Sequence, residues 1–523
     1  MSAFPEHLQS LLHPRAYPHP VQAVQLVETN ISWILLTGEF AYKIKRPVHF
    51  PFVDLRSAER REFLCHEEVR LNRRFASELY LGVSQITSGE GEARIDGSGL
   101  VIEHAVRMRQ FRREDELDRL LETLSIAPAE LAAFGRDLAC IHATLPVAEP
   151  EQTWGRPVAT RALILENVEE CAQAATVFGT DAEVRALRTL LGEHLEAAAH
   201  WMSERFHGAR VRECHGDLHA RNIVRRGSRL LAFDCLEFER AFRWIDVADE
   251  VAFLLADLDS SRYSQHAQAF LGGYLTHSGD YQACRLLPLY KAHRSLVRAK
   301  VTALSAGTVA TSAGGDITPM RQQYDDYLDC ARRSLSPNRP ILILMNGLSG
   351  SGKTWIAKRL APLLGAVHLR SDIERKRLGG LPELANSSSA PEQGLYSREA
   401  STRVYQHLAH CASDTLAGGY TTIIDATFHR REDRALFYDL SVELGVATCL
   451  VQCEAPPEVL RARVQARRQR GDDPSDADLS VLQWQETHCE PVQGDESFVL
   501  FEAVTNRSDV IDTLTRKIGA LTV

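Results

Sequence analysis

Two carboxylates and one amide in the first half of the chain have the types and the spacing that phosphoryl transfer requires. Asp217 lies in the stretch CHGDLHARN at residues 214–222, Asn222 follows five positions later, and Asp234 ends an apolar run. One such group can receive the proton of a substrate hydroxyl, and two can hold Mg²⁺ on the phosphates of ATP. A plain Asp-containing turn would explain His-Gly-Asp alone, but the complete set in this order favours a kinase catalytic loop.

A second phosphate-binding motif follows far downstream, after the apolar run at residues 341–346. Its pattern Gly-x4-Gly-Lys-Thr, between a strand-like run and an amphipathic helix, is typical of a P-loop that binds ATP or GTP. Lys353 would reach the β and γ oxygens and Thr354 would bind Mg²⁺, while backbone N–H groups surround the phosphates. The predicted nucleotide-binding residues are Gly347, Ser349, Gly350, Ser351, Gly352, Lys353 and Thr354.

Two further carboxylates end apolar runs downstream of the P-loop. Asp372 follows the run at 366–370 and precedes a basic segment with Arg375 and Arg377, so it could receive a hydroxyl proton while arginines hold an anionic acceptor. Asp372 could equally be a helix N-cap, and both roles are compatible. Asp425 ends the run at 421–425 in the Walker B position and is predicted to hold Mg²⁺ or its water shell.

An arginine-rich helix is expected over residues 461–470. In a small P-loop kinase such a helix closes over the phosphates, and Arg463 and Arg467 would supply positive charge in the transition state. A solvated helix surface is the alternative.

The elements that must position the first site begin with a hairpin predicted at residues 31–36 and 40–45. Alternation puts Ala41, Lys43 and Lys45 on one face, and Lys43 suits the lysine that binds phosphates in a kinase. A solvated edge strand is the alternative. The helix predicted over 56–75 carries Glu67 and Glu68, of which Glu68 is the favoured partner of that lysine.

Further elements lead to the catalytic loop. Strands are predicted at 79–83 and 100–108 with a glycine-rich turn between 88 and 99, followed by helices within 114–145 and 161–207. A hairpin at 223–224 and 230–233 would bring Asp217, Asn222 and Asp234 to one end. A helix is expected over 245–256, where Asp246 could complement the helix dipole or support the catalytic loop. The basic face of a helix at 286–305 could meet an anionic substrate or be solvated.

Composition indicates a globular protein of several domains. The 523 residues suggest about three structural units, the content is 44% hydrophobic and 25% charged, and the formal net charge is −9. This acidic balance argues against a general nucleic-acid binder without excluding local basic patches. The 11 cysteines lack CxxC pairs, and neither a signal peptide nor an apolar run of membrane-spanning length is found, so a cytoplasmic protein without membrane insertion is expected.

These patterns predict a multidomain α/β chain. Residues 1–335 would form a two-lobed, protein-kinase-like α+β domain with an N-lobe at 1–108 and a C-lobe at 109–335. Residues 336–340 would be a linker, and residues 341–523 a P-loop domain with a parallel sheet.

The motifs resemble known families. The first domain resembles the aminoglycoside phosphotransferase-like kinases through Ala41-Tyr42-Lys43, the Asp217 to Asn222 loop and Asp234, and the second resembles the small P-loop kinases grouped with polynucleotide, gluconate and zeta-toxin kinases. The whole chain is similar to bacterial two-domain proteins that combine these modules. The resemblance implies that Asp217 is the catalytic base, that Asn222 and Asp234 bind Mg²⁺, and that Lys43 binds phosphate. It gives the P-loop kinase roles to Lys353, Thr354, Asp372 and Asp425.

The sequence departs from the first family in one respect that concerns ATP binding. Its first lobe has a single glycine, Gly38, where kinases often have a glycine-rich loop. The expected function is an ATP-dependent kinase with two modules, each moving the γ-phosphoryl group to a hydroxyl of a small molecule. The alternatives are a pseudokinase that regulates a P-loop ATPase, and a 5′-hydroxyl nucleic-acid kinase that uses the arginines at 461–470.

Overall fold

The structure is a computed structural model that describes residues 4–50, 53–89, 91–311, 315–385, 394–470, 473–505 and 507–522. It separates into two compact units, each built from discontinuous segments. The first contains Met1–Glu130, Ile141–Glu166 and Met202–Asp257, and the second contains Leu131–Cys140, Asn167–Trp201 and Leu258–Val523. The folding domains predicted at 1–335 and 341–523 stay a prediction. No described helix combines the length and the apolar character needed to span a membrane.

An antiparallel six-stranded sheet in the order β1-β2-β3-β8-β6-β7 begins the first unit. Its strands are β1 (Gln25–Glu28), β2 (Ser32–Leu36), β3 (Phe40–Lys45), β6 (Tyr80–Gly89), β7 (Glu92–Ile95) and β8 (Leu100–Arg109), and a separate small ribbon pairs β4 (His49–Phe50) with β5 (Val53–Asp54). The predicted hairpin is present as β2 and β3, with Ile34 opposite Lys43. The turn predicted between 88 and 99 is wrong in part, because β7 forms inside it and pairs with β6. Gly38 lies in the β2–β3 turn, whereas residues 29–31 connect β1 to β2 without a glycine.

Helix α1 (Ala58–Ala76) packs on this sheet and brings a carboxylate with it. The hydroxyl of Ser57 accepts the backbone N–H of Arg60 and caps the helix. Leu64 and Leu71 are fully buried, and each such side chain contributes roughly 2 kcal/mol through its removal from water. Glu68 lies on the buried side too, so it needs positively charged partners within the protein.

Short strands and two helices hold the predicted catalytic loop of the first unit. Its elements are α2 (Leu117–Glu122), β9 (Val211–Glu213), β10 (Ile223–Arg226), β11 (Arg229–Ala232), β12 (Trp244–Asp246) and α6 (Val247–Ser260). The hairpin predicted around 227 forms as β10 and β11. The helix expected from residue 245 begins at Val247, because Trp244–Asp246 pairs with β9 as a strand.

Helices make up the remainder of the kinase-like region. They are α3 (Pro128–Thr144), α4 (Pro157–Ala174), α5 (Asp181–His207), α7 (Ser264–Ser278), α8 (Leu287–Thr311) and α9 (Thr318–Leu335). The basic face expected on α8 is largely internal. Lys291 pairs with Asp259 at 2.5 Å, and His293 and Arg294 are buried.

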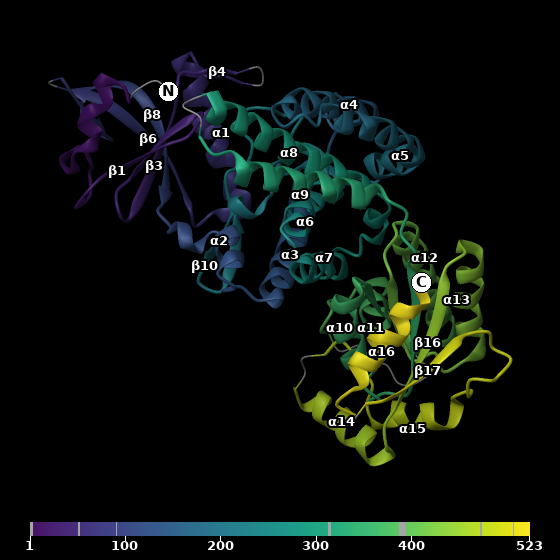
Figure 1. The fold of residues 1–523 in the computed structure, drawn as a ribbon. Helices are drawn as coiled ribbons and strands as arrows, with labels where there is room; N and C mark the ends of the chain where they lie inside the picture. The colour runs from purple at the N-terminus through teal and green to yellow at the C-terminus, as the bar shows by residue number, and fades with distance from the viewer. Residues whose placement is uncertain are drawn as a thin grey trace. The chain divides into compact units, whose positions relative to one another are not determined.

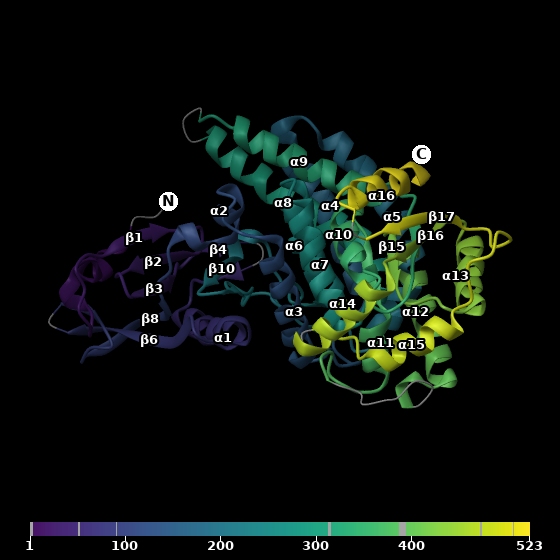
Figure 2. The same ribbon diagram turned by 90° about the horizontal axis from the view of Figure 1, so that it is seen from below.

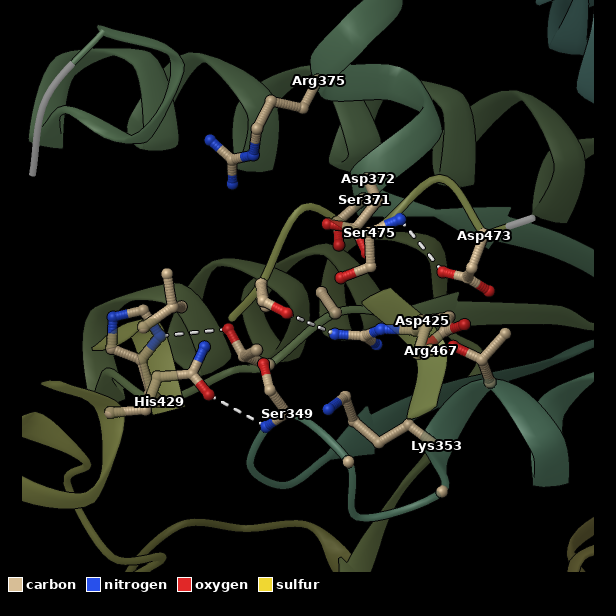
Figure 3. A pocket seen from close by; sticks show the side chains of 18 of the residues that line it. Ser349, Lys353, Ser371, Asp372, Arg375, Asp425, His429, Arg467, Asp473 and Ser475 are labelled. Atoms are coloured by element: carbon tan, nitrogen blue, oxygen red, sulfur yellow. Dashed lines mark hydrogen bonds between the residues drawn. The ribbon is translucent and has the colours of Figure 1, made fainter. Parts of the chain in front are cut away.

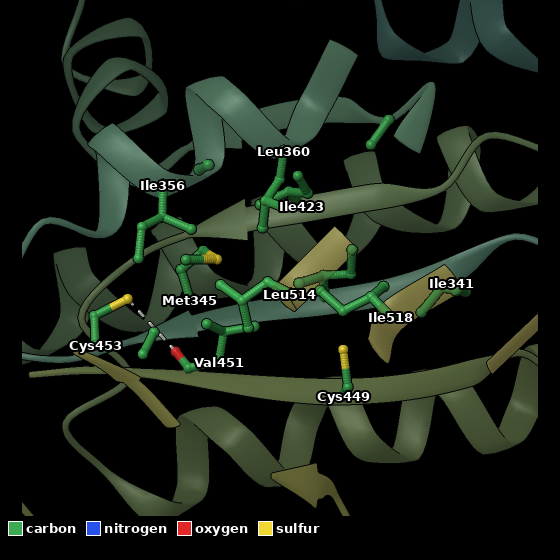
Figure 4. Close-up of a cluster of buried hydrophobic side chains, with 14 of the residues drawn as sticks. Ile341, Met345, Ile356, Leu360, Ile423, Cys449, Val451, Cys453, Leu514 and Ile518 are labelled. Atoms are coloured by element: carbon green, nitrogen blue, oxygen red, sulfur yellow. Dashed lines mark hydrogen bonds between the residues drawn. The ribbon is translucent and has the colours of Figure 1, made fainter. Parts of the chain in front are cut away.

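The second unit also contains a five-stranded parallel sheet in the order β14-β15-β13-β16-β17. Its strands are β13 (Ile341–Asn346), β14 (Val367–Arg370), β15 (Thr422–Asp425), β16 (Ala447–Glu454) and β17 (Val499–Val504), and the described helices around it are α10 (Lys353–Leu364), α11 (Ser371–Leu378), α12 (Arg398–Ala417), α13 (Arg431–Leu444), α14 (Pro457–Arg470), α15 (Leu479–His488) and α16 (Val510–Gly519). Helices α10 and α16 lie side by side (Figures 1 and 2). Ile356 and Leu514 from these helices pack with Met345 and Val451 in one apolar core (Figure 4).

Because all five strands are parallel, their carboxyl ends share one edge of the sheet. The P-loop follows β13, Asp372 follows β14, and Asp425 ends β15. The fold thus gathers the predicted residues of the second site at that edge.

Candidate functional site

The candidate site in the first unit centres on a buried lysine of β3. Lys43 Nζ donates to Glu68 Oε1 at 2.9 Å and to Asp234 Oδ1 at 2.5 Å. Glu67, the neighbouring carboxylate on α1, binds Arg70 and Arg243 instead. The structure therefore joins three of the predicted residues, from β3, from α1 and from the segment after β11.

A second lysine on the same face of β3 extends this cluster. Lys45 Nζ donates to Glu68 Oε2 at 2.7 Å and to Glu237. Glu237 is buried and was not predicted, because no motif or spacing in the sequence marks a carboxylate three positions after Asp234. Glu68 thus bridges two buried ammonium groups.

Burial and charge act in opposite directions on these groups. Burial alone would raise the pKa of Glu68, but Lys43 and Lys45 outweigh it and lower the pKa to about 2. Burial alone would lower the pKa of Lys43, but Asp234 and Glu68 outweigh it and hold this pKa well above its usual value. Glu68 and Lys43 are therefore charged at neutral pH.

Asp217 and Asn222 of the predicted catalytic loop meet through the amide of Asn222. Its Nδ2 donates to the backbone carbonyl of Asp217 and to Asp217 Oδ2, both at 3.0 Å. The N–H of Phe233 donates to the carbonyl of Asn222. Asp234 is the next residue, so this bond holds its backbone near the loop. Asp234 has a φ of +65° and donates its N–H to the hydroxyl of Tyr80.

Two carboxylates of α6 hold the predicted catalytic loop through its backbone N–H groups. Glu250 accepts the backbone N–H groups of His215 and Gly216 at 2.6 and 2.9 Å, and Asp257 accepts that of Ala220 at 2.9 Å. Asp246, for which the sequence left this supporting role open, instead binds the guanidinium of Arg205 at 2.8 Å.

The second candidate site is a cavity of about 390 Å³ at the carboxyl edge of the parallel sheet (Figure 3). The predicted residues that line it are Ser349, Gly350, Gly352, Lys353, Thr354, Asp372, Asp425, Arg463 and Arg467. Gly347 and Ser351 belong to the P-loop but do not line the cavity.

Glycine is required at several P-loop positions by backbone conformation and by space. Gly347 has a φ of +139°, and a Cβ there would lie 2.5 Å from the carbonyl of Cys453. Lys353 Nζ donates to the carbonyls of Gly347 and Leu348 at 2.7 and 3.0 Å, so it lies across its own loop. The N–H of Ser349 donates to Gln485 Oε1 at 2.9 Å.

Asp425 faces positively charged and hydrogen-bonding groups. His368 Nε2 lies 3.2 Å and Arg370 Nε 3.8 Å from Asp425 Oδ2. Burial alone would raise the pKa of Asp425, but the His368 hydrogen bond and the Arg370 charge lower it to about 2. Burial lowers the pKa of Lys353, although the negative charge of Asp425 acts to raise it. Asp425 is thus an anion that can bind a cation.

Asp372 lines the cavity from the first turn of α11. The N-cap position is occupied by Arg370, so the reading of Asp372 as the N-cap is wrong. Arg375 also lines the cavity, whereas Arg377 donates to the backbone carbonyls of Thr276 and His277. Of these two arginines only Arg375 is placed to meet an acceptor.

The cavity has an aromatic side that sequence reasoning missed. His429 shares a hydrogen bond at 3.1 Å with Thr427 through Nδ1 and meets the ring of Trp484 edge-on at 5.4 Å. Its Nε2 is buried without a hydrogen-bond partner among the described residues. Burial lowers the pKa of His429 to about 4, so the ring is neutral at pH 7. The only available signal was its place just after β15, at the edge where ligands bind.

The arginines of α14 are partly fixed at the cavity. Arg463 Nη1 donates to the carbonyl of Gly350 at 3.2 Å and to Thr505 Oγ1 at 2.9 Å, and Arg467 donates to the carbonyl of Ala477. Arg468, with a side chain 73% exposed, fits the solvated alternative instead.

Comparison with known proteins identifies both parts of the chain. Residues 55–287 match the model of the phosphotransferase enzyme family, and residues 342–492 match an AAA domain model. Uncharacterised proteins of Mycobacterium bovis and Mycobacterium tuberculosis are each 29% identical over 452 residues, which cover 86% of this chain and 88% of theirs.

Two solved structures with partial similarity have kinase names. A choline/ethanolamine kinase family protein from Mesorhizobium loti has a TM-score of 0.36 and 12% identity, covering 60% of this chain and 89% of its own. A gluconokinase from Sinorhizobium meliloti has a TM-score of 0.26 and 16% identity, covering 36% of this chain and 95% of its own. On the two family matches, the chain is a phosphotransferase enzyme that joins a domain of the phosphotransferase enzyme family to a P-loop kinase-like domain.

Proposed function

We propose that each of the two domains binds ATP with Mg²⁺ and transfers its γ-phosphoryl group to a hydroxyl of a small molecule. The observation that carries this proposal is that one cavity of the P-loop domain is lined by Lys353, Asp372 and Asp425. A phosphate-binding lysine, an ionised carboxylate for a metal and a second carboxylate for the acceptor are the groups that this reaction needs.

In the P-loop domain, Thr354 and Asp425 would hold Mg²⁺, since hydroxyl and carboxylate oxygens are the ligands that this ion prefers. The bound ion would neutralise charge on the phosphates. Lys353 would turn from its loop carbonyls to the β and γ oxygens, and Asp372 would receive the proton of the acceptor hydroxyl. Arg463 and Arg467 would stabilise charge as the phosphoryl group moves.

In the first domain, Asp217 would receive the acceptor proton while Asn222 and Asp234 hold Mg²⁺. Asn222 already fixes the Asp217 carboxylate through its amide. Glu68 would keep Lys43 aimed at the phosphates. Lys43 contacts Asp234 here, so nucleotide and metal would take over the two ends of that ion pair.

Separate single substitutions test the two modules. Asp217→Asn and Lys353→Ala would each be assayed in the full chain by ADP formation with a fractionated metabolite extract. Each substitution should abolish the ADP formation that depends on one set of fractions and spare the other set. The proposal fails if neither substitution changes ADP formation.

A regulatory, inactive first domain is the second candidate. The Lys43–Asp234 ion pair and the β1–β2 turn without glycine favour it, because both weaken the usual contacts with phosphates. Calorimetric titration of the Lys353→Ala variant with ATP decides between the two. If ATP binding persists in this variant and the additional substitution Lys43→Ala removes it, the first domain binds nucleotide. If no ATP binding persists, the regulatory role is indicated.

A further inference from the structure

A second cavity, of about 1160 Å³, lies within the second unit at the amino edge of the parallel sheet. Residues 333–339, which lead into β13, and residues 416–421, which lead into β15, form two of its walls. The P-loop and Asp425 lie at the opposite, carboxyl ends of the same strands. No residue lines both cavities in the described part of the chain, so this groove is separate from the phosphoryl-transfer site.

The groove is positively charged, although the chain has a net charge of −9. Its described lining includes Arg285, Lys291, Arg333 and Arg339 but no Asp or Glu. A cavity lined by one sign of charge concentrates ions of the opposite sign. The groove therefore favours an anionic occupant.

Two of the four cations are fixed by carboxylates that lie outside the lining. Arg285 Nε donates to Asp414 Oδ1 at 2.5 Å, and Lys291 Nζ donates to Asp259 Oδ2 at 2.5 Å. The guanidinium of Arg285 also lies over the ring of Trp201, 4.2 Å from its centre. These contacts hold the two side chains in place and offset their positive charge.

The other two cations are uncompensated. Arg333, near the end of α9, and Arg339, just before β13, are exposed, and neither side chain has an ion pair or hydrogen bond with the described residues. Two guanidinium groups within one groove offer planar, forked donors that match phosphate oxygens.

We propose that this groove binds a phosphorylated small molecule, with Arg333 and Arg339 on its phosphate oxygens. A volume of about 1160 Å³ admits a ligand of nucleotide size. Such a ligand would contact the segments that enter β13 and β15, the strands whose far ends carry the P-loop and Asp425.

Hydrogen exchange of the full chain, measured by mass spectrometry, tests this site. The Lys353→Ala background weakens the P-loop site, and the probes are ADP and, separately, inorganic pyrophosphate at millimolar concentration. Peptides covering 333–339 and 416–421 should become protected by at least one probe. Protection by both indicates recognition of phosphate alone, and protection by ADP only indicates that the nucleoside contributes.

Matched charge variants identify the residues responsible. Arg333→Ser with Arg339→Ser should raise the probe concentration for half-maximal protection at least tenfold. Arg188→Ser with Arg516→Ser removes the same charge from exposed positions outside the groove and should leave that concentration unchanged. An unchanged melting temperature would show that both double variants fold.

Three results would overturn the proposal. They are absence of protection by either probe, equal weakening by both double variants, and protection of these peptides by nucleic acid but not by the small probes.

Discussion

Replacing Glu68 by Gln tests whether one carboxylate holds the two buried lysines of the first site. The substitution keeps the side-chain shape but removes the charge that faces Lys43 and Lys45 at 2.9 and 2.7 Å. Lowering the pKa of Glu68 from 4.5 to about 2 corresponds to about 3 kcal/mol of stability at neutral pH. Full burial leaves little solvent to screen this contribution.

The sign of the pH dependence follows from that lowered pKa. The folded state binds the Glu68 proton less tightly than the unfolded state, so the contribution is complete above pH 4.5 and is lost as pH falls towards 2. The Glu68→Gln variant should therefore be destabilised at pH 7 and should approach the unchanged protein in strong acid.

Hydrogen exchange of peptides from β3 and α1 is the assay. A loss of about 3 kcal/mol should speed the exchange of their slowest amides roughly a hundredfold at pH 7. Glu62→Gln is the control, because it removes a carboxylate of the same helix whose side chain is 48% exposed. Its effect should stay below about tenfold. Equal acceleration in both variants would refute the central role assigned to Glu68.

Three other changes have defined outcomes. Gly347→Ala should abolish nucleotide binding to the P-loop domain in a calorimetric titration, because its Cβ would lie 2.5 Å from the carbonyl of Cys453. Gly445→Ala, at a helix end with no atom near the new Cβ, should leave nucleotide binding unchanged. Arg434→Met should destabilise the P-loop domain by about 3–5 kcal/mol in urea unfolding, because Glu496 would lose its buried partner; a change below 1 kcal/mol would contradict this. The pKa of Asp425 is lowered to about 2, so protonation of Asp425 should not reduce P-loop activity above about pH 4. A loss of activity near pH 5, at a pH that His368→Gln raises, would show that the pKa of Asp425 is higher.

Most of the site-bearing elements could be predicted because their chemistry is local. The β2–β3 hairpin, the β10–β11 hairpin and the P-loop each have characteristic residues within a short stretch. A helix with Glu67 and Glu68 near its middle was also predicted, and α1 forms there. The alternation of β3 similarly put Lys43 and Lys45 on one face.

Features that depend on tertiary pairing could not be predicted. Trp244–Asp246 becomes a strand only because β9 lies beside it, so the next helix starts later than its composition suggested. Glu250 rather than Asp246 supports the catalytic loop because Arg205, distant in sequence, takes the Asp246 carboxylate. Glu237 reaches its site from a segment whose spacing carries no signal, and the only signal for His429 was its place after β15.

The hydrogen bonds inside the P-loop have a consequence for the heat of nucleotide binding. Lys353 already donates to Gly347 and Leu348, and the Ser349 N–H already donates to Gln485. A phosphate that binds these groups exchanges existing bonds for stronger charge-assisted ones and does not create them from unpaired donors. The enthalpy of binding should therefore be smaller than the number of phosphate contacts suggests, and Gln485→Ala should make it more favourable by freeing one donor in advance.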